Sequence, residues 1–156
     1  MSDVEVRVRR YQPSDREAAV LLAPRLQTGV AGWRDPDAVR RAVTGWIESS
    51  LANADAEDRE VFVAHAGEDV IGLVTVAERP HFTGEIDAYV GELVVRATHE
   101  RRGVGTLLMD AAENWARRRG HQRITVETGA ANRTARAFYN RCGYREEDVR
   151  LTKTLD

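Results

Sequence analysis

The chain has 156 residues, a length typical of one domain, and its 42% hydrophobic and 31% charged residues give the balance of a folded protein. A net charge of -2 argues against a general nucleic-acid binder, and a single cysteine, Cys142, with four scattered histidines excludes an internal disulfide and predicts no metal site. We expect a cytoplasmic protein without membrane contact, because no apolar run approaches the roughly 20 residues of a membrane span and the first residues lack a signal-peptide pattern.

The first half of the chain contains both strand and helix patterns. Alternating apolar and charged side chains predict half-buried strands, whereas apolar side chains at three- and four-residue spacing behind a capping residue predict helices. By these criteria we expect, in chain order, a strand at 4–8, a helix from 13–15 to near Pro24, a helix from Asp35-Pro36 to Leu51, and strands at 61–64, 70–76 and 88–95. The turn at 67–69 makes the middle two strands an antiparallel hairpin.

The second half predicts a crossover between strands. We expect an amphipathic helix from Val104 to 117–120, a strand at 124–127, a helix at 132–142, and one or two closing strands within 144–155. This order predicts one domain over residues 1–156 with a mixed α/β (α+β) fold. Its central sheet is expected to be largely antiparallel, with six to seven strands flanked by four helices.

Residues 93–106 predict an anion site. They run from a buried strand through a basic turn into a helix that begins Gly-Val-Gly at 103–105. The free amides of a helix N-terminus bind phosphate, and Arg101 and Arg102 add positive charge. Leu108 stands where a dinucleotide fingerprint has its third glycine, so an ordinary nucleotide site is excluded. The segment alone leaves an ordinary turn with solvated arginines open.

Two segments carry a family resemblance. Residues 100–105, Glu-Arg-Arg-Gly-Val-Gly, resemble the pyrophosphate loop Gln/Arg-x-x-Gly-x-Gly/Ala of the GCN5-related N-acetyltransferases. Residues 132–144 are similar to the family's Asn-x-x-Ala-x-x-Phe-Tyr-x-x-x-Gly-Phe/Tyr. Glu100 departs from the usual Gln or Arg, which leaves the backbone amides as the expected anion cradle. The resemblance covers about residues 61–144.

The resemblance implies direct transfer of the acetyl group of acetyl-CoA to an amine within a ternary complex, without a metal. The implied cofactor contacts come from the strand before the loop, the loop itself and the second motif. They are Leu93, Val94, Val95, Arg101, Arg102, Gly103, Val104, Gly105, Thr106 and Asn132. A backbone N–H near Val94 or Val95 would bind the oxyanion.

Three side chains are candidates for moving protons. The resemblance implies that Tyr139 protonates the leaving thiolate, and the spacing of Glu127 from Asn132 and Tyr139 matches members with a base at that place. Glu92, on the preceding strand, is the rival base. Viewed singly, Tyr139 could be core and either glutamate a solvent-facing strand residue.

The expected acceptor is a small-molecule amine. Four carboxylates near the strand connection would attract a cation, although a solvated loop explains them equally well; they are Glu78, Glu85, Asp87 and Glu92. Residues 78–95 and 144–147 loosely resemble small aminoglycoside 3-N-acetyltransferases, and Trp33 is a candidate for the pocket wall. A protein N-terminal or lysine acetyltransferase and a non-catalytic acetyl-CoA sensor are the alternatives. A homodimer is left open.

Overall fold

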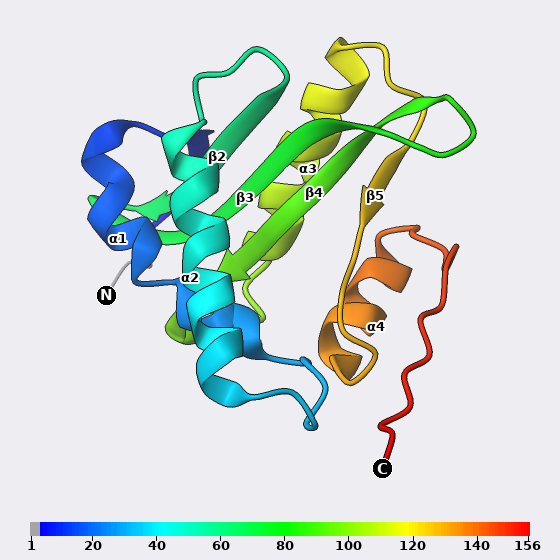
Figure 1. Cartoon of the computed structure of the whole chain (residues 1–156). Coiled ribbons are helices and arrows are strands. Elements are labelled where there is room, and N and C mark those ends of the chain that lie inside the picture. The colour runs from blue at the N-terminus through cyan, green and yellow to red at the C-terminus, as the bar shows by residue number, and fades with distance from the viewer. Residues whose placement is uncertain (1–3) are drawn as a thin grey trace.

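The computed structural model describes residues 4–156, which fold around a five-stranded sheet (Figure 1). The strands lie in the order of the sequence, β1 to β5, with antiparallel pairing from β1 to β4 and parallel pairing between β4 and β5. Their bounds are β1 Val6–Arg10, β2 Arg59–Ala66, β3 Asp69–Pro80, β4 Ile86–Val95 and β5 Ile124–Val126. The mixed α/β class and the central hairpin are therefore confirmed.

Helices cover both faces of the sheet. The four α-helices are α1 Arg16–Val20, α2 Pro36–Ala52, α3 Val104–Arg118 and α4 Arg133–Arg141, and short 3-10 turns lie at Pro13–Asp15, Ala23–Gln27 and Ala97–His99. On one face, Val61 and Val63 of β2 pack with α1 and α2. On the other face, their neighbours Phe62 and Ala64 pack with α3. Apolar side chains on both sides of a strand explain why its sequence is continuously apolar.

The helix starts follow the capping signals of the sequence. Asp35 accepts a hydrogen bond from the Ala38 amide at 2.9 Å, and Pro36 occupies the first helical position of α2. Asn132 caps α4 in the same way through the Ala135 amide at 3.2 Å. Within residues 4–156, no helix combines the length and apolar character needed to cross a bilayer.

The prediction of six to seven strands was wrong. The sheet has five strands, and residues 145–156 form neither a helix nor a strand in this structure. Their alternating pattern fits an extended strand, but an extended segment becomes a strand only when another backbone pairs with it. No described segment of the chain does so, and every residue from 145 to 156 is exposed.

The sheet opens between β4 and β5. Pairing is limited to Ala88 with Ile124, Tyr89 with Thr125, and Val90 with Val126. Beyond Val90, β4 continues to Val95, while the chain after β5 turns away toward α4 (Figure 1). Beyond Val90, no described strand therefore lies next to the backbone edge of β4 on this side.

Candidate active site

The opening beside β4 contains the strand residues that the family resemblance implied as cofactor contacts. Leu93, Val94 and Val95 lie beyond the last pair with β5, so their open backbone edge can form strand-like hydrogen bonds with an extended ligand. One of these groups is occupied, because the carbonyl of Val95 accepts a hydrogen bond from Arg25 Nε at 2.7 Å.

A bulge between β3 and β4 positions Glu92. The register passes from Val74–Leu93 to Val76–Val90, so Thr75 alone faces two residues of β4. A Cβ atom on one of them, Gly91, would lie 2.9 Å from the Thr75 hydroxyl oxygen, so this close approach requires glycine. The bulge turns the Glu92 side chain toward α2.

The Glu92 carboxylate is buried and held by two hydroxyls. The side chain of Thr75 donates a hydrogen bond to Oε2, and Ser50 of α2 donates another at 3.0 Å. Glu92 is 7% exposed, and burial raises the pKa of its carboxyl, against the opposing effect of the two hydrogen bonds. A raised pKa brings a carboxylate closer to the basicity that proton abstraction near neutral pH requires.

A cavity of about 200 Å³ lies against Glu92 on the α2 face of the sheet. Ser50, Glu60, Tyr89 and Glu92 are among the residues that line it. Arg59 lines it too, and Glu60 is paired with Arg10 at 3.4 Å, so Glu92 and the Tyr89 ring are the groups of this wall suited to a small cationic group.

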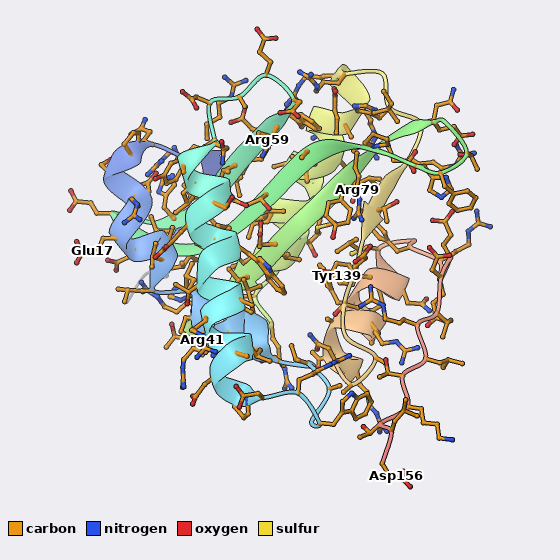
Figure 2. The ribbon with its side chains drawn as sticks, viewed as in Figure 1. Glu17, Arg41, Arg59, Arg79, Tyr139 and Asp156 are labelled. Atoms are coloured by element: carbon orange, nitrogen blue, oxygen red, sulfur yellow. The ribbon has the colours of Figure 1, made fainter. Side chains whose placement is uncertain are left out.

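Glu127 has a different environment. It lies one residue beyond β5, whereas the sequence predicted it as the last residue of that strand, and its side chain is 60% exposed and pairs with Arg79 Nη1 at 3.4 Å. The Arg79 guanidinium lies 4.3 Å from the centre of the Tyr89 ring (Figure 2 labels Arg79). Glu127 is thus a solvent-facing member of an ion pair near the opening.

Of the four acidic residues proposed for acceptor binding, two are ion-paired and a third does not line the cavity. Arg119 and His121 contact the Glu78 carboxylate, at 2.7 and 3.2 Å, and Arg123 contacts Glu85 at 2.7 Å. The third, Asp87, is buried and does not line the cavity. Of this group only Glu92 faces the cavity.

Tyr139 lies on α4, beside the opening (Figure 2). Its ring packs against those of Phe138 and Tyr144, with centroids 5.3 and 5.7 Å away. Burial raises the pKa of Tyr139 to about 12, so the phenol stays protonated at neutral pH. The Tyr139 hydroxyl forms no hydrogen bond with residues 4–156. Because every fully buried side-chain oxygen in that range has a hydrogen-bond partner, this hydroxyl is not fully buried and is accessible to solvent or to a ligand.

The N-terminus of α3 is open, as the predicted anion cradle requires. Gly103 adopts a left-handed conformation with φ 79°, and no side chain caps the helix. The first helical hydrogen bond joins the Leu107 amide to the Gly103 carbonyl at 3.1 Å, so the amides of 104–106 remain free. Arg101 and Arg102 are exposed beside it. The free amides that the predicted cradle requires are therefore present, and their binding of an anion stays a prediction.

Gly105 has a packing role that the sequence did not reveal. A Cβ atom at this position would lie 3.3 Å from Cζ of Phe138, so glycine lets α4 pack closely against the first turn of α3. This contact joins the two segments that carry the family resemblance.

Arg25 is a further residue that sequence reasoning missed. Its guanidinium forms an ion pair with Glu100 while Nε donates to the Val95 carbonyl. Because Arg25 and Glu100 are 75 positions apart, no local pattern could reveal the pair. Glu100 in a place where a basic or amide residue was expected was the only hint of such a partner.

The side chain of Asn132 connects the loop after the second 3-10 turn to α4. Its Nδ2 donates to the Thr28 carbonyl at 3.3 Å while Oδ1 caps the helix. Gly29 and Gly129 permit this approach, since a Cβ atom on either would lie within 2.2 Å of the facing segment. Trp33, a candidate for the pocket wall, is exposed and does not line the cavity beside Glu92.

A second cavity, of about 310 Å³, lies between α3 and α4 and includes Cys142 in its wall. Burial raises the pKa of the Cys142 thiol, which disfavours the thiolate that a nucleophile requires. The described residues contain no group of three or more His, Cys, Asp or Glu side chains placed to share a metal ion.

Comparisons with known proteins identify several similarities. Residues 26–144 match the acetyltransferase (GNAT) family. The chain is 30% identical to N-alpha-acetyltransferase 30 of Schizosaccharomyces pombe over 83 residues, 53% of this chain and 55% of that protein. It is 26% identical to aminoglycoside N(6')-acetyltransferase type 1 of Klebsiella aerogenes over 141 residues, 83% of this chain and 92% of that protein. This relative is an N(6') enzyme, whereas the sequence had suggested similarity to 3-N enzymes.

The fold is also similar to that of solved structures. AAC(6')-Iy in complex with the bisubstrate analog CoA-S-monomethyl-acetylneamine superimposes with a TM-score of 0.69 at 18% identity, over 97% of this chain and 99% of that one. The chain spans about half the length of several curated relatives that it matches.

Proposed function

The chain belongs to the acetyltransferase (GNAT) family, and we propose that it transfers the acetyl group of acetyl-CoA directly to the primary amine of a small molecule in a ternary complex. The observation that carries this proposal is the buried Glu92 carboxylate, which lies beside both the open edge of β4 and the 200 Å³ cavity. A base at this place would meet an amine in the cavity and a thioester held along the strand.

The backbone of this chain fits acetyl-CoA. The free amides of 104–106 would bind the pyrophosphate, with Arg101 and Arg102 as charged partners. The open edge of Leu93–Val95 would bind the pantetheine arm by strand-like hydrogen bonds. Asn132 would join that contact by exchanging its 3.3 Å bond to Thr28 for a ligand carbonyl.

The proton of the incoming ammonium would pass to Glu92. A carboxylate with a raised pKa accepts this proton more readily than an ordinary one, and Thr75 and Ser50 fix its orientation before the amine arrives. Glu127 is the second candidate, but it is exposed and would have to leave Arg79 to act. We therefore rank Glu92 above Glu127, the reverse of the order that sequence spacing favoured.

The remaining steps use groups on β4 and α4. Of the two backbone N–H groups expected to bind the oxyanion of the tetrahedral intermediate, that of Val95 would do so, because it points to the open edge, whereas alternation directs that of Val94 to β3. When the C–S bond breaks, the Tyr139 phenol would donate its proton to the departing thiolate and regain one as the nitrogen of the new amide releases its second proton. Its pKa of about 12 keeps that proton in place until the transfer.

A protein N-terminus is the second candidate acceptor, because one relative is named as an N-alpha-acetyltransferase. The cavity favours the small-molecule acceptor, since its 200 Å³ accommodates an alkylamine group and Glu92 lies in its wall. A sensor that binds acetyl-CoA without transferring the acetyl group would not need a buried carboxylate there.

The test is free-thiol release from acetyl-CoA in the presence of small amines, aminoglycosides or N-terminal peptides. Turnover with small amines and its loss in Glu92→Gln support the proposal. Turnover with peptides but not with small amines would show that the acceptor is a protein N-terminus. Thermal stabilisation by CoA but not by ATP or NAD tests the cofactor independently; a ligand at 100 times its dissociation constant adds about 2.7 kcal/mol. Stabilisation by CoA without turnover on any amine would support the sensor.

A further inference from the structure

Arg25 joins two separate parts of the proposed cofactor site. It lies in the 3-10 turn Ala23–Gln27, and its side chain reaches the end of β4, where Nε donates to the Val95 carbonyl at 2.7 Å. The same guanidinium pairs with Glu100, the first residue of the loop that leads into α3. One side chain thus connects the open strand edge with the loop before the predicted anion cradle.

The contact with Val95 satisfies a backbone group that no described strand reaches. The Arg96 N–H donates to the Ile71 carbonyl of β3 at 2.7 Å, so alternation directs both the N–H and the C=O of Val95 to the open edge. Arg25 occupies the carbonyl, while the N–H of the same residue still faces the opening. A charge-assisted hydrogen bond of this kind fixes the end of β4, where the proposed oxyanion donor lies.

The contact with Glu100 neutralises a charge of the wrong sign. Where the family resemblance predicted Gln or Arg, this chain has a carboxylate in the loop that leads to the free amides of 104–106. An unpaired carboxylate in this loop would repel a pyrophosphate bound to those amides. Among residues 4–156, Arg25 is the only ion-pair partner of Glu100.

The backbone that follows Glu100 also needs support. Arg101 has φ 61°, the only positive φ of a non-glycine residue in the described chain, and Gly103 has φ 79°. A left-handed conformation is unfavourable for a residue with a side chain and persists only where neighbouring contacts hold it. The ion pair between Glu100 and Arg25 is such a contact, at the entrance of the strained loop.

We propose that Arg25 is a positioning residue for acetyl-CoA, which holds the end of β4 and the loop 100–105 in one arrangement and cancels the charge of Glu100. This inference rests on the proposed function, because it assumes that acetyl-CoA binds along these two segments. An arginine with a merely structural role would support the two segments equally for charged and uncharged ligands. The charge of the ligand therefore separates the two roles.

The first test is calorimetric titration with CoA. Arg25→Ala should weaken binding about tenfold, because Glu100 is left unpaired near the pyrophosphate. Adding Glu100→Gln to Arg25→Ala should restore the affinity to within about threefold of wild type, and Glu100→Gln alone should bind CoA at least as tightly as wild type. Arg7→Ala removes an equal charge from an exposed ion pair on β1, at the opposite edge of the sheet, and should bind CoA as wild type does.

A truncated ligand is the second test. Pantetheine has the amide arm of CoA without its pyrophosphate, so Arg25→Ala should weaken pantetheine binding much less than CoA binding. Equal losses for the two ligands, or a double variant that binds CoA no better than Arg25→Ala, would overturn the proposal. Wild-type affinity for CoA in Arg25→Ala would contradict this inference alone, whereas a wild-type protein that does not bind CoA would refute the proposed function as well.

Discussion

The Thr75 hydroxyl holds Glu92 at two points: it accepts the Glu92 backbone N–H at 2.9 Å and donates to the Glu92 carboxylate. Together with Ser50, it fixes both the strand position and the side-chain direction of the candidate base. Such fixed orientation lowers the cost of reaching the reactive geometry.

Glu92→Gln should lower turnover by about 10²–10⁴-fold, because the amide keeps the size of the side chain and cannot accept the proton. In the wild-type enzyme kcat/KM should fall at low pH as Glu92 becomes protonated. Profiles of kcat/KM against pH for Glu92→Gln, Glu127→Gln and wild type measure both effects. If Glu127→Gln loses the acidic limb and Glu92→Gln keeps it, Glu127 is the base.

Glu92→Gln should also make the protein more stable at neutral pH. Burial raises the pKa of Glu92, so the folded state holds its proton at pH values where the unfolded chain has released it. The free energy of unfolding therefore falls as pH rises from the ordinary carboxyl pKa through the raised one. Glutamine does not ionise, so the variant does not lose this stability. Its Tm should exceed that of wild type at pH 7, and the difference in Tm should shrink near pH 4. A difference that is independent of pH contradicts the raised pKa.

Thr75→Val should destabilise the fold by about 1–3 kcal/mol, because it leaves the buried N–H of Glu92 without an acceptor. Thr75→Ser keeps the hydroxyl and is the matched control. Thr75 is a positioning residue, so kcat/KM should fall in Thr75→Val and recover in Thr75→Ser. Urea unfolding measures the stability; equal stability of the two variants would show that the hydroxyl does not support Glu92.

Much of the fold was accessible from local chemistry. Asp35 and Pro36 mark the start of α2, and Asn132 marks that of α4, because caps are satisfied by side chains within one turn. The C-terminal pattern was equally clear, yet residues 145–156 form no strand. A strand depends on a partner backbone, which the segment's own sequence does not specify.

Only those parts of the candidate site that consist of backbone groups could be predicted from the sequence. Gly103 and Gly105 predicted the open N-terminus of α3, whereas the side on which Glu92 lies depends on a bulge created by Thr75 and Gly91 on neighbouring strands. Alternation alone allowed either face. The pair formed by Arg25 and Glu100 joins distant segments and has no local signature.

Removing Arg101 and Arg102 together should weaken CoA binding about tenfold and reduce its dependence on salt, because two cations beside the free amides of α3 are lost. Arg118→Ala, at the opposite end of the same helix, is the control and should leave the affinity unchanged. Calorimetric titration with CoA at two salt concentrations measures this. Substituting Gly105 would be a poorer test, since a methyl group there would also press on Phe138. Unchanged affinity in the double variant would remove the two arginines from the site.

Tyr139→Phe should lower turnover by about 10²–10⁴-fold wherever thiolate protonation limits the rate, while CoA affinity and stability change little. The ring contacts with Phe138 and Tyr144 survive the substitution, and only the hydroxyl is lost. Tyr144→Phe is the matched control, because its hydroxyl donates to Glu113 on α3. Single-turnover rates with a saturating amine measure the chemical step directly. A Tyr139→Phe rate equal to that of Tyr144→Phe would show that Tyr139 serves packing alone.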